Sequence, residues 1–300
     1  MKTLIFDVEA DFAHFKSYET TRGNYSFPFP PRTAIIGMIA GLLGFPRNEY
    51  WEFSHPLRYA KIALEVVNPV ERYGLKVNYT RTREKTSIGA GSDRITLHFP
   101  NKPTHPGERG FITPIRLDLL KTIYYRVYCV LEEELFEHLA NALKNRHFKY
   151  PPYLGHANLL AHVTYIGIIE GTRVQTGEMI NIDGIIPISS LKAENPLVSS
   201  GTYDIIYNVP YSQRIHTRSK RFDGKNTFIT KTDGIDNFIL QTVQGQTEVI
   251  AAFKETSLVL KFDLNKLSEA LVKEPWSKMG ITERIIPFWP LSPRESKEIS

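Results

Sequence analysis

The chain has 300 residues, of which 42% are hydrophobic and 23% are charged, and it contains one cysteine. This composition excludes an intrinsically disordered chain, and the length suffices for one large core or two smaller ones. The longest apolar run, residues 34–45, is too short to span a bilayer, and no signal-peptide pattern opens the chain. The lone Cys129 excludes an internal disulfide and a cysteine-based zinc site. We therefore expect a cytoplasmic protein without membrane contact, metal or other cofactor.

The net charge of +5 is distributed unevenly along the chain. Residues 71–121 hold ten Lys/Arg against five Asp/Glu, an excess equal to that of the whole chain. Residues 211–233 hold six Lys/Arg against two Asp, so the remainder is slightly acidic. Positive charge concentrated in this way favours a polyanionic partner, without identifying it.

The first strand is expected over residues 4–12, where apolar side chains alternate with Asp7, Glu9 and Asp11. Three carboxylates on one strand face could bind a divalent metal, as in nucleases and polymerases. A solvated or ion-paired sheet face is the commoner origin of this pattern, and no glycine-rich phosphate loop supports a metal reaction. Because carboxylates repel phosphate, we expect nucleic acid to bind at loops and helix ends rather than across this face.

A helix is expected to begin after the aromatic and proline-rich residues 27–31. Two prolines followed by Arg32-Thr33 and an apolar run are typical of a helix start. Gly37 and Gly41 lie four residues apart within this run. This spacing predicts that the helix packs very closely on a sheet.

The loop before this helix holds the residues best suited to bind nucleic acid. Lys16, Arg22 and Arg32 can contact phosphates, and Tyr25 can stack on a base. Backbone N–H groups at the helix start also suit an anion. The alternative is that these are ordinary solvated charges.

Further along, strands are expected over residues 61–67, 122–131 and 163–170, and an amphipathic helix over 132–146. The order is then strand, helix, strand, strand, helix, strand. This is the βαββαβ pattern of a ferredoxin-like, RRM-like fold in the α+β class. The fifty residues before the third strand are long for a connection between elements, and such segments are usually functional.

The remaining chain is rich in turns and strands. Asp183-Gly184 and Asp223-Gly224 each predict a hairpin, and further strands are expected over 248–253 and 257–262. The predicted organisation is a ferredoxin-like domain at 1–175 with an insertion at 71–121, a β-rich lobe at 176–273, and a peripheral C-terminal tail at 274–300.

The segment from Leu4 to Gly44, which contains NYSFPFPPRTAIIGMIAGLLG, resembles the N-terminus of the fifth CRISPR-associated (Cas) protein family. This family belongs to the RAMP superfamily, and the type I-B-like members are the most similar. The resemblance returns at residues 152–156, PYLGH. It implies a RAMP fold and an RNA-binding subunit of a Cascade surveillance complex that holds the 5′ handle of the guide RNA.

The resemblance also implies two further RNA contacts. The 71–121 insertion is similar to the thumb of this family. Within it Arg81, Arg83 and Lys85 alternate, so on a ribbon they share one face with Tyr79, which offers a stacking surface. The loop at Gly155 resembles the glycine-containing loop whose backbone approaches RNA closely, with His156 where the family often has a basic residue.

The resulting hypothesis is a non-catalytic subunit that caps the 5′ handle of the guide RNA. Its expected partners are the guide RNA, the Cascade backbone RAMP subunit and the Cascade large subunit, with target DNA reached indirectly. The alternative is a metal-independent endoribonuclease that processes CRISPR repeat RNA, as in the type I-C branch of the family. A third hypothesis is an RNA-binding protein unrelated to CRISPR, supported only by charge distribution and element order.

Overall fold

A computed structural model describes residues 1–17, 25–46, 49–52, 54–80, 82–88, 95–100, 112–174, 180–192, 198–200, 203–220, 226–241, 248–267 and 282–291. The fold is α+β, as expected, and its strand pairs are antiparallel. None of the helices in these ranges is long and apolar enough to cross a membrane.

The central sheet contains the strand expected at the start of the chain. Its order is β4-β8-β1-β9, with β1 at Lys2–Ala13, β4 at Lys61–Val66, β8 at Ile112–Val130 and β9 at His162–Glu170. Along the chain, this layer and its helices come in the order β1, α1, β4, β8, α2, β9. Strand β8 is longer than expected because its first half pairs with an inserted strand rather than with β4.

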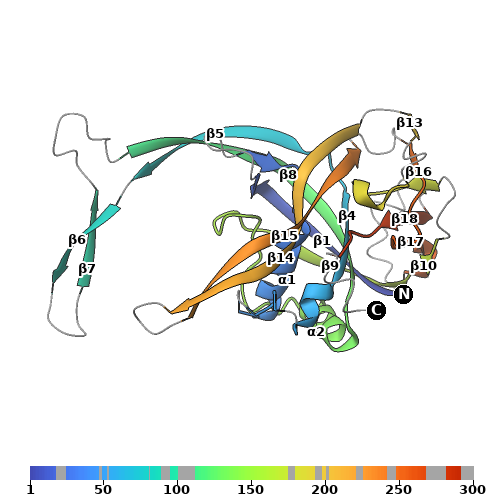
Figure 1. Ribbon diagram of the computed structural model, residues 1–300, viewed down its shortest axis with the longest axis horizontal. Coiled ribbons are helices and arrows are strands. Elements are labelled where there is room, and N and C mark those ends of the chain that lie inside the picture. Colours follow the sequence, from blue (N-terminus) through green and yellow to red (C-terminus); the bar gives the residue numbers. More distant parts are fainter. Residues whose placement is uncertain are drawn as a thin grey trace.

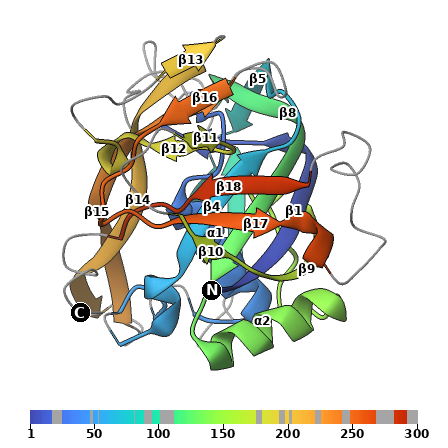
Figure 2. The same ribbon diagram turned by 90° about the vertical axis from the view of Figure 1, so that its right-hand side faces the viewer.

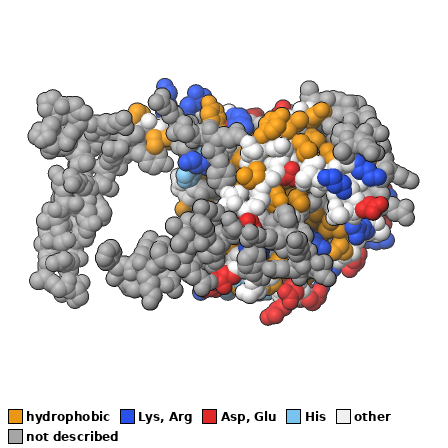
Figure 3. Space-filling view, in the orientation of Figure 1, with side chains coloured by type: hydrophobic (Ala, Val, Ile, Leu, Met, Phe, Trp, Pro, Cys, Tyr) orange, Lys and Arg blue, Asp and Glu red, His pale blue; other side chains and the backbone are white. Residues whose placement is uncertain are grey.

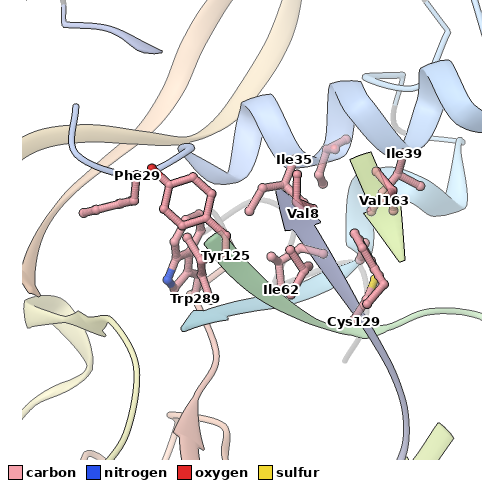
Figure 4. Close-up of a cluster of buried hydrophobic side chains, with 14 of the residues drawn as sticks. Val8, Phe29, Ile35, Ile39, Ile62, Tyr125, Cys129, Val163 and Trp289 are labelled. Atoms are coloured by element: carbon pink, nitrogen blue, oxygen red, sulfur yellow. The ribbon is translucent and has the colours of Figure 1, made fainter. Parts of the chain in front are cut away.

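Both helices pack on one face of this sheet (Figure 1). Helix α1 spans Arg32–Leu43 and α2 spans Glu133–Lys144, close to both expectations. The predicted apolar stripe of α2 is buried, and its charges suit the helix dipole, with Glu133 and Glu134 in the first turn and Lys144 in the last. In the core beneath α1, side chains such as Ile35 and Ile39 meet Val8, Ile62, Cys129 and Val163 of the sheet (Figure 4).

The opposite face of the central sheet is covered by β17 (Val259–Asp263) and β18 (Glu283–Pro287), as Figure 2 shows. Tyr128 of the sheet stacks on Phe262, with ring centroids 5.4 Å apart. Nucleic acid therefore cannot lie across this part of the sheet, because protein occupies it. The expectation that RNA avoids this face rested on charge repulsion, and coverage of this part by β17 and β18 is a second, steric reason for it.

The remaining elements form small sheets around this core. The sheets are β10-β17-β18, β11-β16-β13, β12-β15-β14, β2-β3 and β6-β7. Their bounds are β2 Phe15–Lys16, β3 Ser26–Phe27, β5 Glu71–Thr80, β6 Thr82–Ile88, β7 Ile95–Pro100, β10 Thr172–Arg173, β11 Ile180–Ile182, β12 Ile186–Pro187, β13 Val198–Ser200, β14 Tyr203–Lys220, β15 Asn226–Gln241 and β16 Glu248–Ala251. Short 3-10 helices lie at Pro56–Tyr59, Ile188–Ser190 and Leu264–Lys266.

The prediction of a hairpin around Asp183-Gly184 is wrong. Strand β11 before this turn pairs with β16, and β12 after it pairs with β15. The turn instead packs on the central sheet, where the Ile185 N–H donates to the Leu64 carbonyl at 3.0 Å. Gly184 is required there because its φ is +80° and a Cβ would lie 2.7 Å from that carbonyl oxygen. The strands flanking the second predicted turn, β14 and β15, do pair as a hairpin.

Two long antiparallel pairs extend from the same side of the molecule (Figure 1). In the 71–121 insertion, β5 pairs with the first half of β8, and β6 pairs with β7. We call the pair of β5 with the first half of β8 the β5–β8 ribbon. The other long pair that projects from this side is the β14–β15 hairpin.

Part of the predicted peripheral tail lies inside the fold. Strand β18 pairs with β17, and Trp289 just after it is 2% exposed. The Trp289 ring packs against both Phe29, before α1, and Phe238 of β15, with ring centroids 6.0 and 5.0 Å away, and these two rings also contact each other. The apolar side chains of Ile286, Phe288 and Trp289 explain this burial, because covering this much apolar surface stabilises the fold.

Candidate nucleic-acid interface

A groove of about 970 Å³ runs between α1 and the loop at residues 150–157. The end of β1, strand β2 and the middle of β14 complete its walls, β14 through Pro210 and Gln213. Among the described residues that line it, Lys16 is the only Lys or Arg, and no Asp or Glu is present. The walls are otherwise largely aromatic and aliphatic, which suits the faces of unstacked bases.

The groove face of α1 carries Gly37 and Gly41, which corrects the prediction that these glycines pack against the sheet. The side chains that α1 buries include Ile35, Ile36 and Ile39 instead. A Cβ at Gly41 would have no neighbour within 4 Å, whereas one at Gly37 would lie 3.4 Å from the Tyr50 hydroxyl. The small residues therefore keep the groove open.

The other wall is fixed to the end of β1 at Gly155. The His14 N–H donates to the Leu154 carbonyl at 3.1 Å. Gly155 has φ +91°, and a Cβ there would lie 1.7 Å from the His14 carbonyl oxygen. Glycine is thus required by contact with the protein's own backbone, which is a different reason from the close approach of RNA suggested by the resemblance.

His14 and His156 stack on each other at the rim of the groove, with ring centroids 5.1 Å apart. His14 is buried, and its Nδ1 lies 2.8 Å from the Asp118 carbonyl oxygen. Burial lowers the pKa of His14, and the positive potential of His156 and Lys16 lowers it further, although the contact with the Asp118 carbonyl opposes them. A cation here is unfavourable in the absence of an anion.

Lys16 and Tyr25 lie side by side where β2 meets β3. The Ser17 N–H donates to the Tyr25 carbonyl at 2.9 Å, and Lys16 pairs with Ser26. Lys16 is exposed and Tyr25 is 57% exposed, so both side chains can reach a ligand. Only Lys16 lines the groove.

Arg32 is not available to phosphate, which corrects its predicted role. Its side chain is fully buried. The guanidinium donates to the backbone carbonyls of Arg58 and Ala60 at 2.6 and 2.8 Å, and to that of Tyr211 at 2.9 Å. Arg32 therefore joins the start of α1 to β14. The sequence could not distinguish this role from anion binding, because an arginine at a helix start suits both.

Several predicted contacts cannot be located. Arg22 and Arg81 lie outside the described residues, as do the side chains of Tyr79, Arg83 and Lys85. Conversely, the structure adds Tyr150 and Tyr153 to the groove, and these are 56% and 48% exposed. A tyrosine on each side of Pro151-Pro152, next to the glycine loop, is the sequence signal for them.

The β5–β8 ribbon is anchored near this site by Asp118. The Arg72 guanidinium lies 2.5 Å from the Asp118 carboxylate and donates to the Ser26 carbonyl at 3.1 Å. Further exposed basic residues of the ribbon are Lys76, Arg116 and Lys121. Figure 3 shows Lys and Arg side chains where the ribbon leaves the body of the molecule.

On the acidic face of β1, the buried carboxylate of Asp7 is ion-paired with Arg126. Asp7 is 2% exposed and accepts two hydrogen bonds from Arg126, each 2.7 Å long, and one from the Tyr124 hydroxyl. Burial would lower the pKa of Arg126, but the hydrogen bonds to Asp7 and its charge raise it overall. Glu9 and Asp11 are exposed. In the described part of the chain, no three His, Cys, Asp or Glu residues could hold a metal ion.

The sequence model of the family described as "CRISPR-associated protein (Cas_Cas5)" matches residues 3–221. This match covers most of the chain, including β1, α1, the central sheet and the loop at 150–157. The chain therefore belongs to the CRISPR-associated Cas5 family. No match was found among curated proteins.

Several solved structures are similar at low sequence identity. A chain of a "CRISPR RNA-guided surveillance complex" is 13% identical, with 84% of this chain and 90% of that chain covered and a TM-score of 0.40. A CRISPR protein from Archaeoglobus fulgidus is 11% identical, with 96% and 98% covered and a TM-score of 0.40. A chain of the type III-B Cmr-beta complex bound to target RNA is 12% identical, with 84% and 86% covered and a TM-score of 0.33. The family assignment rests on the sequence match, and these likenesses carry no further argument.

Proposed function

We propose that this Cas5-family protein is a non-catalytic, RNA-binding subunit of a type I-B-like Cascade complex. It holds the 5′ handle of the guide RNA in the groove between α1 and the loop at 150–157. The observation that carries this proposal is the make-up of the groove, which is rich in aromatic and apolar surface, free of carboxylates among its described residues, and cationic at one rim. Single-stranded RNA needs that combination, because bases stack on aromatic faces and phosphates pair with cations.

The fold supports this role. The sheet order β4-β8-β1-β9, with α1 and α2 on one face, is consistent with a ferredoxin-like RAMP core. We assign the β5–β8 ribbon, with β6 and β7, as the thumb. It would contact the neighbouring backbone subunit, while the large subunit docks beside the handle and brings target DNA to the complex.

The geometry of His14 argues against its use as a general base. A general base needs an accessible nitrogen near the reacting hydroxyl. His14 is buried, its Nδ1 contacts a backbone carbonyl, and its ring is covered by His156. These contacts fix the rim of the groove and leave His14 poorly placed as a base.

The test is binding of a fluorescent 5′-handle RNA, compared with an unrelated RNA of equal length, in EDTA and in magnesium. We expect tighter binding of the handle and no cleavage in either buffer. If about four or five phosphates are neutralised, the logarithm of affinity should fall with the logarithm of salt at a slope of roughly −3. Site-specific cleavage that Tyr25→Phe or a histidine substitution abolishes would instead establish the endoribonuclease.

A further inference from the structure

The sequence of the β14–β15 hairpin contains a second concentration of basic residues, beyond the residues through which this hairpin lines the groove. We propose that its outer half, residues 212–220 and 226–232, is an arm that binds the phosphates of the same single-stranded RNA where it leaves the groove. This inference rests on the proposed function and adds a second contact surface to it.

The charge of this outer half has one sign. Its two strands carry Arg214, Arg218, Lys220 and Lys231, and they contain no Asp or Glu. Apart from Asp223, which lies between the two strands in the sequence, the acidic residues of the hairpin, which are Asp204, Asp233 and Asp236, lie outside this half. Four like charges on two adjacent strands, without an acidic residue among them, are the electrostatic signature of a phosphate-binding surface.

The acidic residues near the base are already used within the protein. Asp233 lies 3.7 Å from the guanidinium of Arg58, which is fully buried. Asp236 accepts hydrogen bonds from the Ser189 hydroxyl and from the N–H groups of Ser189 and Asn237. These carboxylates therefore hold the base of the hairpin to the body of the protein, whereas the two outer strands contain basic residues and no acidic ones.

The strand register places two of the basic residues directly opposite each other. Arg214 pairs with Lys231 across the hairpin. Like charges at directly opposed positions destabilise an antiparallel pair. An arrangement that costs stability in the free protein becomes favourable when an anion binds both residues, so this register points to a polyanionic ligand.

The base of the arm is held to the body of the protein by close contacts, and it begins at the groove. The Tyr211 carbonyl accepts from buried Arg32, and the Tyr211 ring fills the space over Gly234, where a Cβ would lie 2.5 Å from it. Pro210 and Gln213 line the groove, so the basic positions follow directly on its wall. This continuity favours the RNA strand in the groove over an acidic protein surface as the ligand.

The test compares Arg214→Ala/Lys231→Ala with Lys261→Ala/Lys266→Ala, a control that removes the same charge from the β17 region. At 0.1 M salt, two lost phosphate contacts should weaken handle binding about 25-fold and make the log–log salt slope shallower by about 1.4. The control should bind as wild type does. The hairpin variant should melt at the wild-type temperature or slightly above it, because the opposed charges are gone.

The outcomes separate this inference from the proposed function. If wild-type protein binds the handle but the hairpin variant keeps its affinity and slope, the arm is refuted and the groove stands. If the hairpin variant binds handle RNA as tightly as wild type but no longer binds another subunit of the complex, the RNA-binding arm is refuted in favour of an acidic protein partner. If the hairpin substitutions weaken binding of duplex DNA as much as binding of handle RNA, the assignment to single-stranded RNA is refuted. If wild-type protein does not bind the handle at all, both proposals are refuted.

Discussion

Gly155→Ala should be strongly destabilising and should also weaken RNA binding. The new Cβ would lie 1.7 Å from the His14 carbonyl oxygen, so the loop must move until this contact exceeds about 3.0 Å. Such a shift breaks the hydrogen bond of 3.1 Å between the His14 N–H and the Leu154 carbonyl. Positive-φ strain of about 1–2 kcal/mol, overpacking of about 1–3 kcal/mol and one lost hydrogen bond of about 1 kcal/mol together suggest a loss of roughly 3–6 kcal/mol.

Urea denaturation measures this loss, and handle RNA affinity reports the displaced wall of the groove. Gly41→Ala is the matched control, because nothing lies within 4 Å of its Cβ. That control should stabilise the protein by about 1 kcal/mol through helix propensity. A Gly155→Ala protein as stable as wild type would show that the loop does not pack on His14 as described.

Two further predictions concern stability. His14 has a lowered pKa in the folded state, so its contribution to stability is complete above the unfolded value of 6.5 and is lost as the pH falls toward the folded value. His14→Asn, which keeps a donor for the Asp118 carbonyl, should flatten the dependence of unfolding free energy on pH in this window, and an unchanged profile would contradict the assignment. Trp289→Ala should lower the free energy of unfolding measured in urea by about 3–5 kcal/mol, because it leaves a cavity beside Phe29 and Phe238. A loss below 1 kcal/mol would mean that this ring does not hold the C-terminal strands.

The sequence predicted the elements whose pattern is local. Alternation over residues 4–12 predicted β1, the prolines before Arg32 predicted the start of α1, and the apolar stripe of α2 predicted its buried face. Each depends on spacing along one segment, so no knowledge of distant residues was needed.

Features that depend on distant contacts could not be predicted in the same way. Helix α1 is apolar on all sides, so its sequence does not show whether Gly41 faces the sheet or the groove. Arg32 looked like an anion ligand because the carbonyls that hold it belong to residues 58, 60 and 211. The packing of Trp289 was missed for the same reason, since its neighbours lie on β15 and before α1.

The most direct test of the account is to fill the groove without disturbing the fold. Gly41→Leu places a side chain in the space that lines the groove, and leucine favours a helix more than glycine does. Gly41→Leu should therefore be at least as stable as wild type yet bind the 5′-handle RNA about tenfold more weakly, the loss of one stacked base. Gly41→Ala should bind more tightly than Gly41→Leu. Wild-type affinity in a folded Gly41→Leu protein would show that the RNA does not occupy this groove.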